Sequence, residues 1–156
     1  MAHSPFRAAL SICVFVLGVC GTGFGVEPQP PTSADRCAVC GMYVEKYTNW
    51  IATIVLEDGS QVFFDGPKDM FKYFLNLGKY KKRSEDIKKL YVTDYYAIQF
   101  IDAQEAFFVS GSDVMGPMGP ELVPLASESD AGTFLQDHAG KAILKFDEVS
   151  LENVPK

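Results

Sequence analysis

The chain has 156 residues, with 14 Lys and Arg against 20 Asp and Glu, and a formal net charge of −6. The length fits one compact domain, and a composition that is 47% hydrophobic and 22% charged is typical of a globular protein. The acidic balance argues against nucleic acid as a partner, because phosphate contacts require clustered Lys and Arg. The sequence also offers no Gly-rich phosphate loop, which disfavours nucleotide binding.

Residues 1–25 have the pattern of an export signal. A short segment with Arg7 and no acid precedes an apolar stretch over 8–19, which is too short for a membrane span of about 20 residues. Small residues before Val26 suit cleavage there, and Cys20 offers an alternative as a lipid attachment site. We therefore expect a protein that is exported, either to the periplasm or lipid-anchored to the membrane through Cys20.

Residues 26–35 are polar and rich in Pro, which predicts a flexible or polyproline-like tether before a domain over residues 36–150. In the first half of that domain, apolar and β-branched residues predict strands at 50–56 and 61–64, joined by a tight turn. Pro67 then begins a helix that should end near Gly78, with Phe71 and Phe74 facing inward.

The second half of the domain predicts further strands around a Gly- and Pro-rich loop at 111–120. Ser127 or Ser129 should cap a helix that runs to about Ala139. The expected strands are 90–92, 97–101, 106–109, 122–125 and 142–146.

The order of hairpin and helix occurs twice. Asp69 and Phe74 in the first helix correspond to Asp130 and Leu135 in the second at a constant offset. The sequence therefore predicts an α+β fold of antiparallel strands and two helices, consistent with two packed ββα-type units.

The strongest chemical signal is Cys37-x-x-Cys40-Gly41-Met42. In an exported protein this pair could form a disulfide, although so short a loop would constrain the unfolded chain little. It could be a redox pair, but it follows a Pro-rich segment and not the strand of a βαβ unit. It could also bind a metal, although closed structural zinc normally needs a second pair of ligands, which the mature chain lacks.

Thioether residues favour a soft metal ion. Met42 follows Cys40 closely, and Met115 and Met118 lie in the Gly- and Pro-rich loop. Thiolate and thioether ligands together select Cu(I), although Met also fills apolar cores, which suits Met70.

Cys37 and His138 are further candidate ligands. The helical spacing of His138 fits a core position better. Asp65, Asp94 and Asp102 lie at predicted strand ends, where such residues mostly cap turns.

Three motifs in this order resemble the NosL family of exported copper-binding accessory proteins. They are RCAVCGM at 36–42, FFDGPKDMFKY at 63–73 and GPMG at 116–119, and the resemblance covers about residues 35–148. It implies a fold of paired ββα units and a Cu(I) chaperone that delivers copper to apo nitrous oxide reductase. It also implies docking on a membrane ABC-type maturation complex. Cys40 and Met42 match the first motif and Met118 the last.

These patterns predict a metallochaperone and not an enzyme. The alternative is a CxxC thiol–disulfide oxidoreductase that serves copper-site maturation. The position of the cysteine pair relative to a helix should distinguish the two.

Overall fold

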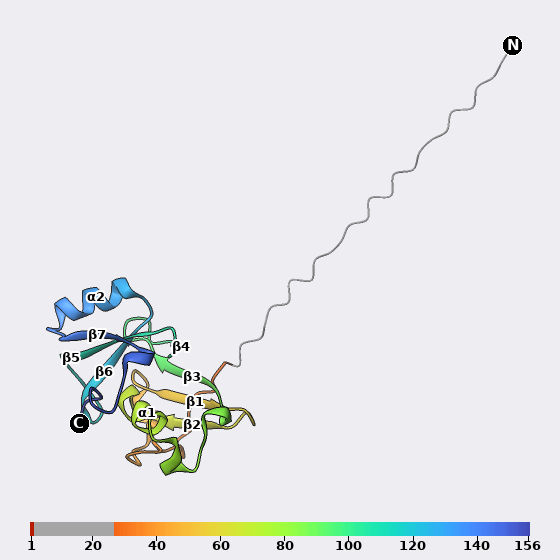
Figure 1. The fold of residues 1–156 in the computed structure, drawn as a ribbon, viewed down its shortest axis with the longest axis horizontal. Helices are drawn as coiled ribbons and strands as arrows, with labels where there is room; N and C mark the ends of the chain where they lie inside the picture. Colours follow the sequence, from red (N-terminus) through yellow and green to blue (C-terminus); the bar gives the residue numbers. More distant parts are fainter. Residues whose placement is uncertain (2–26) are drawn as a thin grey trace.

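The structure is a computed structural model that describes Met1 and residues 27–156. The expected signal peptide and the anchor at Cys20 lie outside the described residues. The described chain forms two antiparallel sheets, each with one helix (Figure 1). The predicted α+β class with two helices is confirmed.

The first unit contains a four-stranded sheet in the order β2-β1-β3-β4. Its strands and helix are β1 (Ala52–Leu56), β2 (Gln61–Phe64), α1 (Pro67–Phe74), β3 (Ile87–Thr93) and β4 (Phe100–Asp102). Short 3-10 helices accompany them: η1 (Val44–Tyr47), η2 (Leu77–Tyr80) and η3 (Ser84–Asp86).

The second unit contains a three-stranded sheet in the order β6-β5-β7. Its elements are β5 (Phe107–Gly116), β6 (Gly119–Leu125), α2 (Glu128–Asp137), β7 (Ala142–Lys145) and the 3-10 helix η4 (Phe146–Glu148). In both units the first strand is flanked by its hairpin partner and by the strand that follows the helix, so the two units share one topology.

The packing joins the two units. Strand β5 sends Phe108 into the larger core, where it meets Phe71 of α1 at a ring distance of 5.0 Å. Its neighbour Val109 points into a smaller core with Phe134 of α2. Helix α1 packs against β1 and β2 and also against β6, whereas α2 packs against the three strands of its own sheet. The larger core therefore encloses α1 between the two units.

Four expectations need correction. The strand expected at 97–101 is β4 at Phe100–Asp102, and the helix expected to end near Gly78 ends at Phe74, before η2. The predicted loop at 111–120 is a hairpin, since β5 continues to Gly116 and β6 begins at Gly119. Gly111 has a φ of 71° where the pairing of β5 with β6 is irregular, and Gly119, with a φ of 89°, begins β6 directly after the turn at Pro117 and Met118. Phe74 is only half-buried, because Tyr73 takes the inward position beside Phe71.

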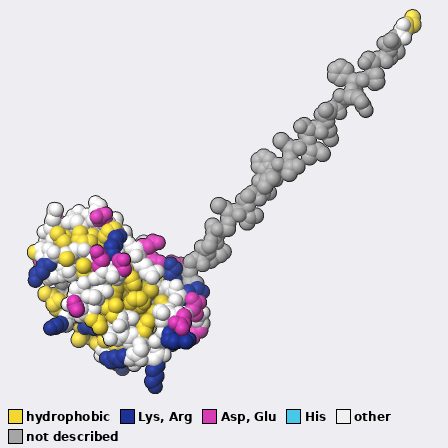
Figure 2. All heavy atoms as spheres, viewed as in Figure 1, with side chains coloured by type: hydrophobic (Ala, Val, Ile, Leu, Met, Phe, Trp, Pro, Cys, Tyr) yellow, Lys and Arg dark blue, Asp and Glu magenta, His cyan; other side chains and the backbone are white. Residues whose placement is uncertain are grey.

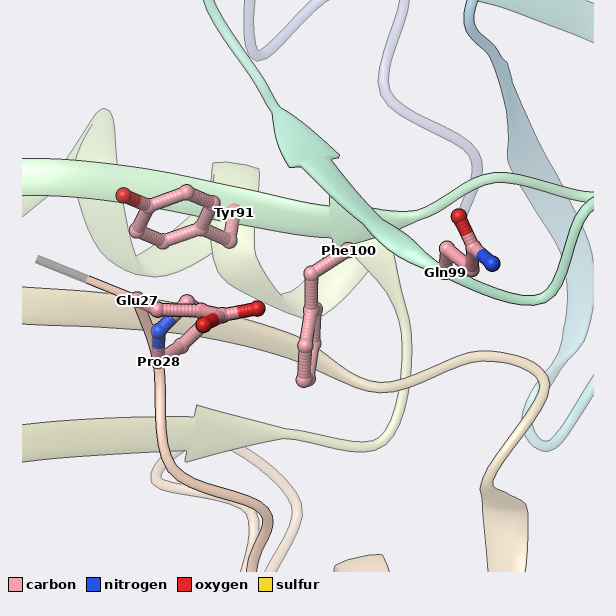
Figure 3. Close-up of a pocket in the computed structure, with 5 residues that line it drawn as sticks. All are labelled: Glu27, Pro28, Tyr91, Gln99 and Phe100. Atoms are coloured by element: carbon pink, nitrogen blue, oxygen red, sulfur yellow. The ribbon is translucent and has the colours of Figure 1, made fainter. Parts of the chain in front are cut away.

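The Pro-rich segment touches the first sheet. Pro28 is buried, and the Gln29 backbone N–H donates to Oε1 of Gln61 at 3.1 Å. Glu27 and Pro28 also line an open groove together with Tyr91, Gln99 and Phe100 (Figure 3). Within the described residues, no helix has the length and apolar character that a membrane crossing requires.

Candidate metal centre

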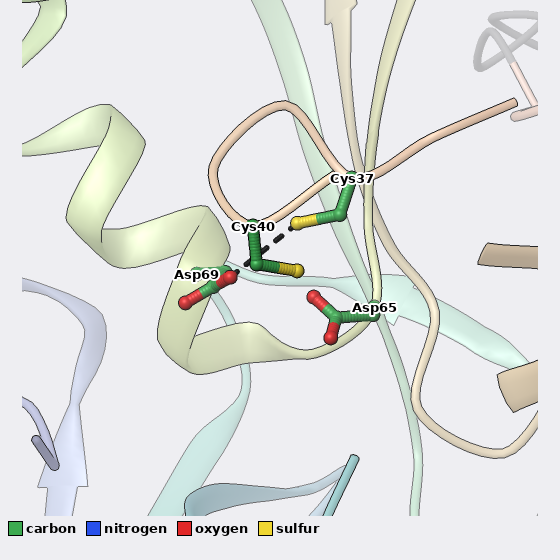
Figure 4. Close-up of side chains that lie close together, drawn as sticks. All are labelled: Cys37, Cys40, Asp65 and Asp69. Carbon is green, nitrogen blue, oxygen red and sulfur yellow. Dashed lines mark hydrogen bonds between the residues drawn. The ribbon is translucent and has the colours of Figure 1, made fainter. Parts of the chain in front are cut away.

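Four side chains converge beside the start of α1. The ligand atoms of Cys37, Cys40, Asp65 and Asp69 all lie within 4.8 Å of one another (Figure 4). The cysteines come from the turn before η1, Asp65 follows β2, and Asp69 lies in the first turn of α1. A turn, a strand end and a helix start thus build one site.

Backbone hydrogen bonds shape the cysteine turn. The Cys37 N–H donates to the Met42 carbonyl at 2.8 Å, and the Gly41 N–H donates back to the Cys37 carbonyl at 2.9 Å. Gly41 has a φ of 79°, which a residue with a side chain rarely adopts. The Ala38 N–H donates to the Phe63 carbonyl at 3.1 Å, which attaches the turn to β2.

Arg36 braces the same turn from outside. Its Nη1 donates to the Gly41 carbonyl at 3.0 Å, and its guanidinium lies 3.8 Å from the centre of the Tyr43 ring. Arg36 and Tyr43 also form an antiparallel backbone bridge. The cysteines therefore lie in a closed turn, and one backbone bridge joins the residues on its two sides.

The two thiols have different surroundings. Cys37 is buried and donates from Sγ to Oδ2 of Asp69 at 3.4 Å, whereas Cys40 is exposed. Burial raises the pKa of the Cys37 thiol strongly, and the neighbouring Asp65 carboxyl raises it further. Partial desolvation of its sulfur also raises the pKa of Cys40. Both thiols are therefore protonated at neutral pH.

Asp65 is a buried carboxyl group without a hydrogen-bond partner. Neither of its oxygens has one among the described residues, although the side chain is almost fully buried. Such a group costs free energy, and in a native protein it points to an ion or a functional role. Asp69, by contrast, accepts from Cys37 and from Nζ of Lys72 at 3.4 Å.

The structure separates the candidate ligands along the fold. Cys37 and Cys40 lie together, and Met42 is half-buried in the same turn. Met118 is at the tip of the β5–β6 hairpin, half-exposed, and its carbonyl is bound by the side chain of Lys68, the residue before Asp69.

Met115 and His138 lie elsewhere. Met115 lines a groove with Trp50 and Tyr95. His138 ends α2, where Nδ1 lies 3.1 Å from Oδ1 of Asp113 and the ring stacks on Phe134. The four-residue cluster does not include His138.

Sequence reasoning did not select Asp65 and Asp69 as site residues. It assigned Asp65 to turn capping, the role that Asp94 does fill by accepting three backbone N–H groups. The available signal was the pair of acids on either side of Gly66-Pro67, one at a strand end and one in the first helical turn.

A model of the NosL family matches residues 28–154. The copper-binding lipoprotein NosL of Stutzerimonas stutzeri is 30% identical over 132 residues, and the match covers 80% of this chain and 66% of that protein. The chain thus spans slightly less than two thirds of that relative.

Two solved structures are similar. The copper chaperone NosL from Shewanella denitrificans superposes with a TM-score of 0.69 at 24% identity, over 82% of this chain and 98% of that one, and it shares the fold. Apo-NosL from Achromobacter cycloclastes has a TM-score of 0.46 at 29% identity, over 66% of this chain and 87% of the other. The family match over nearly the whole described chain is decisive: this protein belongs to the NosL family.

Proposed function

We propose that this protein is an extracytoplasmic metallochaperone that binds Cu(I) at the cysteine turn and delivers it to a copper enzyme. Family membership and the copper-binding name of its relative from Stutzerimonas stutzeri support this role. We further propose nitrous oxide reductase as the receiving enzyme and a membrane ABC-type complex as a docking partner. The lipoprotein name of the same relative supports export, with an anchor at Cys20.

The observation that carries the proposal is the pairing of a buried thiol with an exposed one. A carrier must hold its ion and still release it to a partner by exchanging one ligand at a time. Buried Cys37 suits the retained ligand, and exposed Cys40 suits the ligand that a partner can replace. In this proposal Met42 in the same turn and Met118, whose carbonyl is bound by Lys68 of α1, supply thioethers that complete a donor set favouring Cu(I).

The carboxyl groups have a supporting role in this proposal. Carboxylate oxygen is a hard ligand and a poor primary partner for Cu(I). Asp69 orients the Cys37 sulfur through their hydrogen bond, as outer groups commonly orient metal ligands.

The geometry favours this function over a thiol–disulfide oxidoreductase. A redox CxxC typically lies at the start of an α-helix, where the thiol pKa is lowered. Here the turn leads into the 3-10 helix η1, and the pKa of both thiols is raised. If the measured reduction potential of the Cys37–Cys40 pair were close to that of the compartment in which the protein works, the enzyme would be favoured instead.

The test is a competition titration of the mature chain against a Cu(I) chelator under anaerobic, reducing conditions. Cys40→Ser should weaken Cu(I) binding most, because it removes a charged soft ligand. Met118→Leu should weaken it less and leave stability nearly unchanged, since the exchange roughly conserves volume. Zn(II) should compete poorly, because thioether contributes little to zinc binding.

Met70→Leu is the matched control, since Met70 is a buried methionine on α1, and this variant should bind Cu(I) as the wild type does. If the double variant Cys40→Ser/Met118→Leu also competes as well as the wild type, the proposed site is wrong.

A further inference from the structure

The first turn of α1 contains a buried lysine whose side chain binds the other unit. Lys68 is only 2% exposed. Its Nζ donates to the carbonyls of Met118 and Pro120, both at 2.9 Å. Lysine is almost never fully buried unless it is paired, so these two hydrogen bonds fix the tip of the β5–β6 hairpin against α1.

A buried glutamate completes this connection. Glu121 of β6 is 3% exposed, and its Oε1 accepts the Lys68 N–H at 2.6 Å and the Leu122 N–H at 2.9 Å. The N-cap residue of α1 is Gly66, which has no side chain to accept the Lys68 N–H. A residue of the second unit therefore caps the helix of the first.

Two glycines leave room for the glutamate. A Cβ atom at Gly66 would lie 2.3 Å from Oε2 of Glu121, and one at Gly116 would lie 3.0 Å from its Cγ. A larger residue at Gly66 would displace the carboxyl group that caps the helix. The sequence thus keeps the start of α1, strand β6 and the hairpin in close contact.

We propose that Lys68 is a positioning residue for the Met118 thioether. Lys68 binds the Met118 carbonyl and directly precedes Asp69, which binds the Cys37 thiol. Two consecutive residues of one helical turn thus link the hairpin methionine and the cysteine turn. Lys68 sets where the thioether stands relative to the cysteines and so contributes to Cu(I) affinity without touching the ion.

This inference rests on the proposed function, and a double-mutant cycle tests it. In the mature chain, Lys68→Leu, which removes the donor without adding a sulfur atom, should weaken Cu(I) binding by about 10-fold, at the lower end of what loss of an outer partner costs. In the Met118→Leu background the same change should cost less than about 2-fold, because Lys68 acts through Met118. X-ray absorption should show one fewer sulfur neighbour of copper in Lys68→Leu, as in Met118→Leu.

Two further variants control for stability and chemistry. Phe134→Leu perturbs the smaller core around α2 and should lower the unfolding midpoint without changing Cu(I) affinity. Lys68→Arg keeps N–H donors for the two carbonyls and should restore most of the affinity. If Lys68→Leu does not fold, Lys68→Gln takes its place in the cycle, because its uncharged amide ends one atom short of the two carbonyls.

The outcomes are separable. If Lys68→Leu weakens binding equally in the wild-type and in the Met118→Leu background, or leaves the sulfur count unchanged, Lys68 has only a structural role and the inference is wrong. If Met118→Leu itself has no effect while Cys40→Ser does, Met118 is not a ligand and this inference fails, although the cysteine site stands. If Cys40→Ser has no effect either, the proposed function fails first.

Discussion

The two units share one topology but differ in what surrounds their helices. Asp65 follows β2 directly, and Ala126 holds the same place after β6. Asp69 is the third residue of α1 and accepts from Cys37, whereas its counterpart Asp130 is part of the local cap of α2, where its N–H donates to Ser127 Oγ. The third residue of the helix thus belongs to the candidate metal centre in the first unit and to the N-terminal cap of the helix in the second.

The fifth residue of each helix explains the difference. In α1 it is Phe71, which packs across the interface on Phe108 of β5. In α2 it is Gly132, and a Cβ built there would meet nothing within 4 Å. A helix that is covered by two sheets can have polar groups from several segments brought to its first turn, whereas a peripheral helix offers only its own residues.

The largest expected effect comes from Phe71, which packs on Phe108 of the other unit. Phe71→Ala should lower the free energy of unfolding by about 3–5 kcal/mol, as a large-to-small change in a buried core. Urea denaturation followed by far-UV circular dichroism and by the fluorescence of Trp50, which packs at the smaller core, measures it. The two signals should change together, because Phe71 contacts both units.

Phe74→Ala is the matched control on the same helix. Phe74 is only half-buried, so its truncation should cost clearly less than that of Phe71. Separate transitions by the two probes would show instead that the units unfold independently.

A smaller effect with the opposite sign is expected at Asp65. Asp65→Ala installs the residue type that the second unit has at this place, and it removes a buried carboxyl group that has no hydrogen-bond partner within the described chain. The metal-free protein should become more stable by about 1–3 kcal/mol, the cost of such a group. Chemical denaturation of the metal-free variant measures this gain.

Asp94→Ala provides the comparison, since Asp94 is equally buried but accepts three backbone N–H groups. That change should destabilise the protein. If Asp65→Ala also destabilises the protein, the Asp65 carboxyl group has hydrogen-bond partners in solution. It is then not an unpaired group that is available to a metal site.

Local patterns predicted most of the fold, and contacts between segments that are distant in the sequence account for what they missed. The strands at 52–56 and 61–64, the start at Pro67 and the cap at Ser127 all follow from nearby residues. The hairpin at 107–125 was missed because Gly111 and Gly119 suggest a loop, and only the pairing of the two strands shows that Gly111 lies within β5 and that Gly119 begins β6.

The site follows the same rule. The cysteine turn is local and was predicted, whereas its contact with Asp65 and Asp69 depends on how β2 and α1 pack against it. Nothing near Lys68 in the sequence indicates that Glu121 caps its helix, because the two residues belong to different units.

A pH-dependent effect separates the two ways of capping a helix. Burial raises the pKa of Glu121 from its ordinary value of 4.5 to about 8. A carboxyl group whose pKa is raised on folding stabilises the protein fully below the unfolded value, and this contribution is lost as the pH rises through the folded value. The free energy of unfolding should therefore fall between about pH 5 and 8, by at most about 1.4 kcal/mol per pH unit for one proton.

Glu121→Gln keeps the acceptor for the Lys68 N–H but cannot ionise. The denaturation midpoint of this variant should therefore depend less on pH across this range. Other groups that titrate there remain in both proteins and cancel in the difference. Ser127→Ala, which removes the uncharged cap of α2, should instead lower stability by about 1 kcal/mol at every pH. An unchanged slope in Glu121→Gln would mean that the carboxyl group at the start of α1 is ionised throughout and that the cap does not titrate.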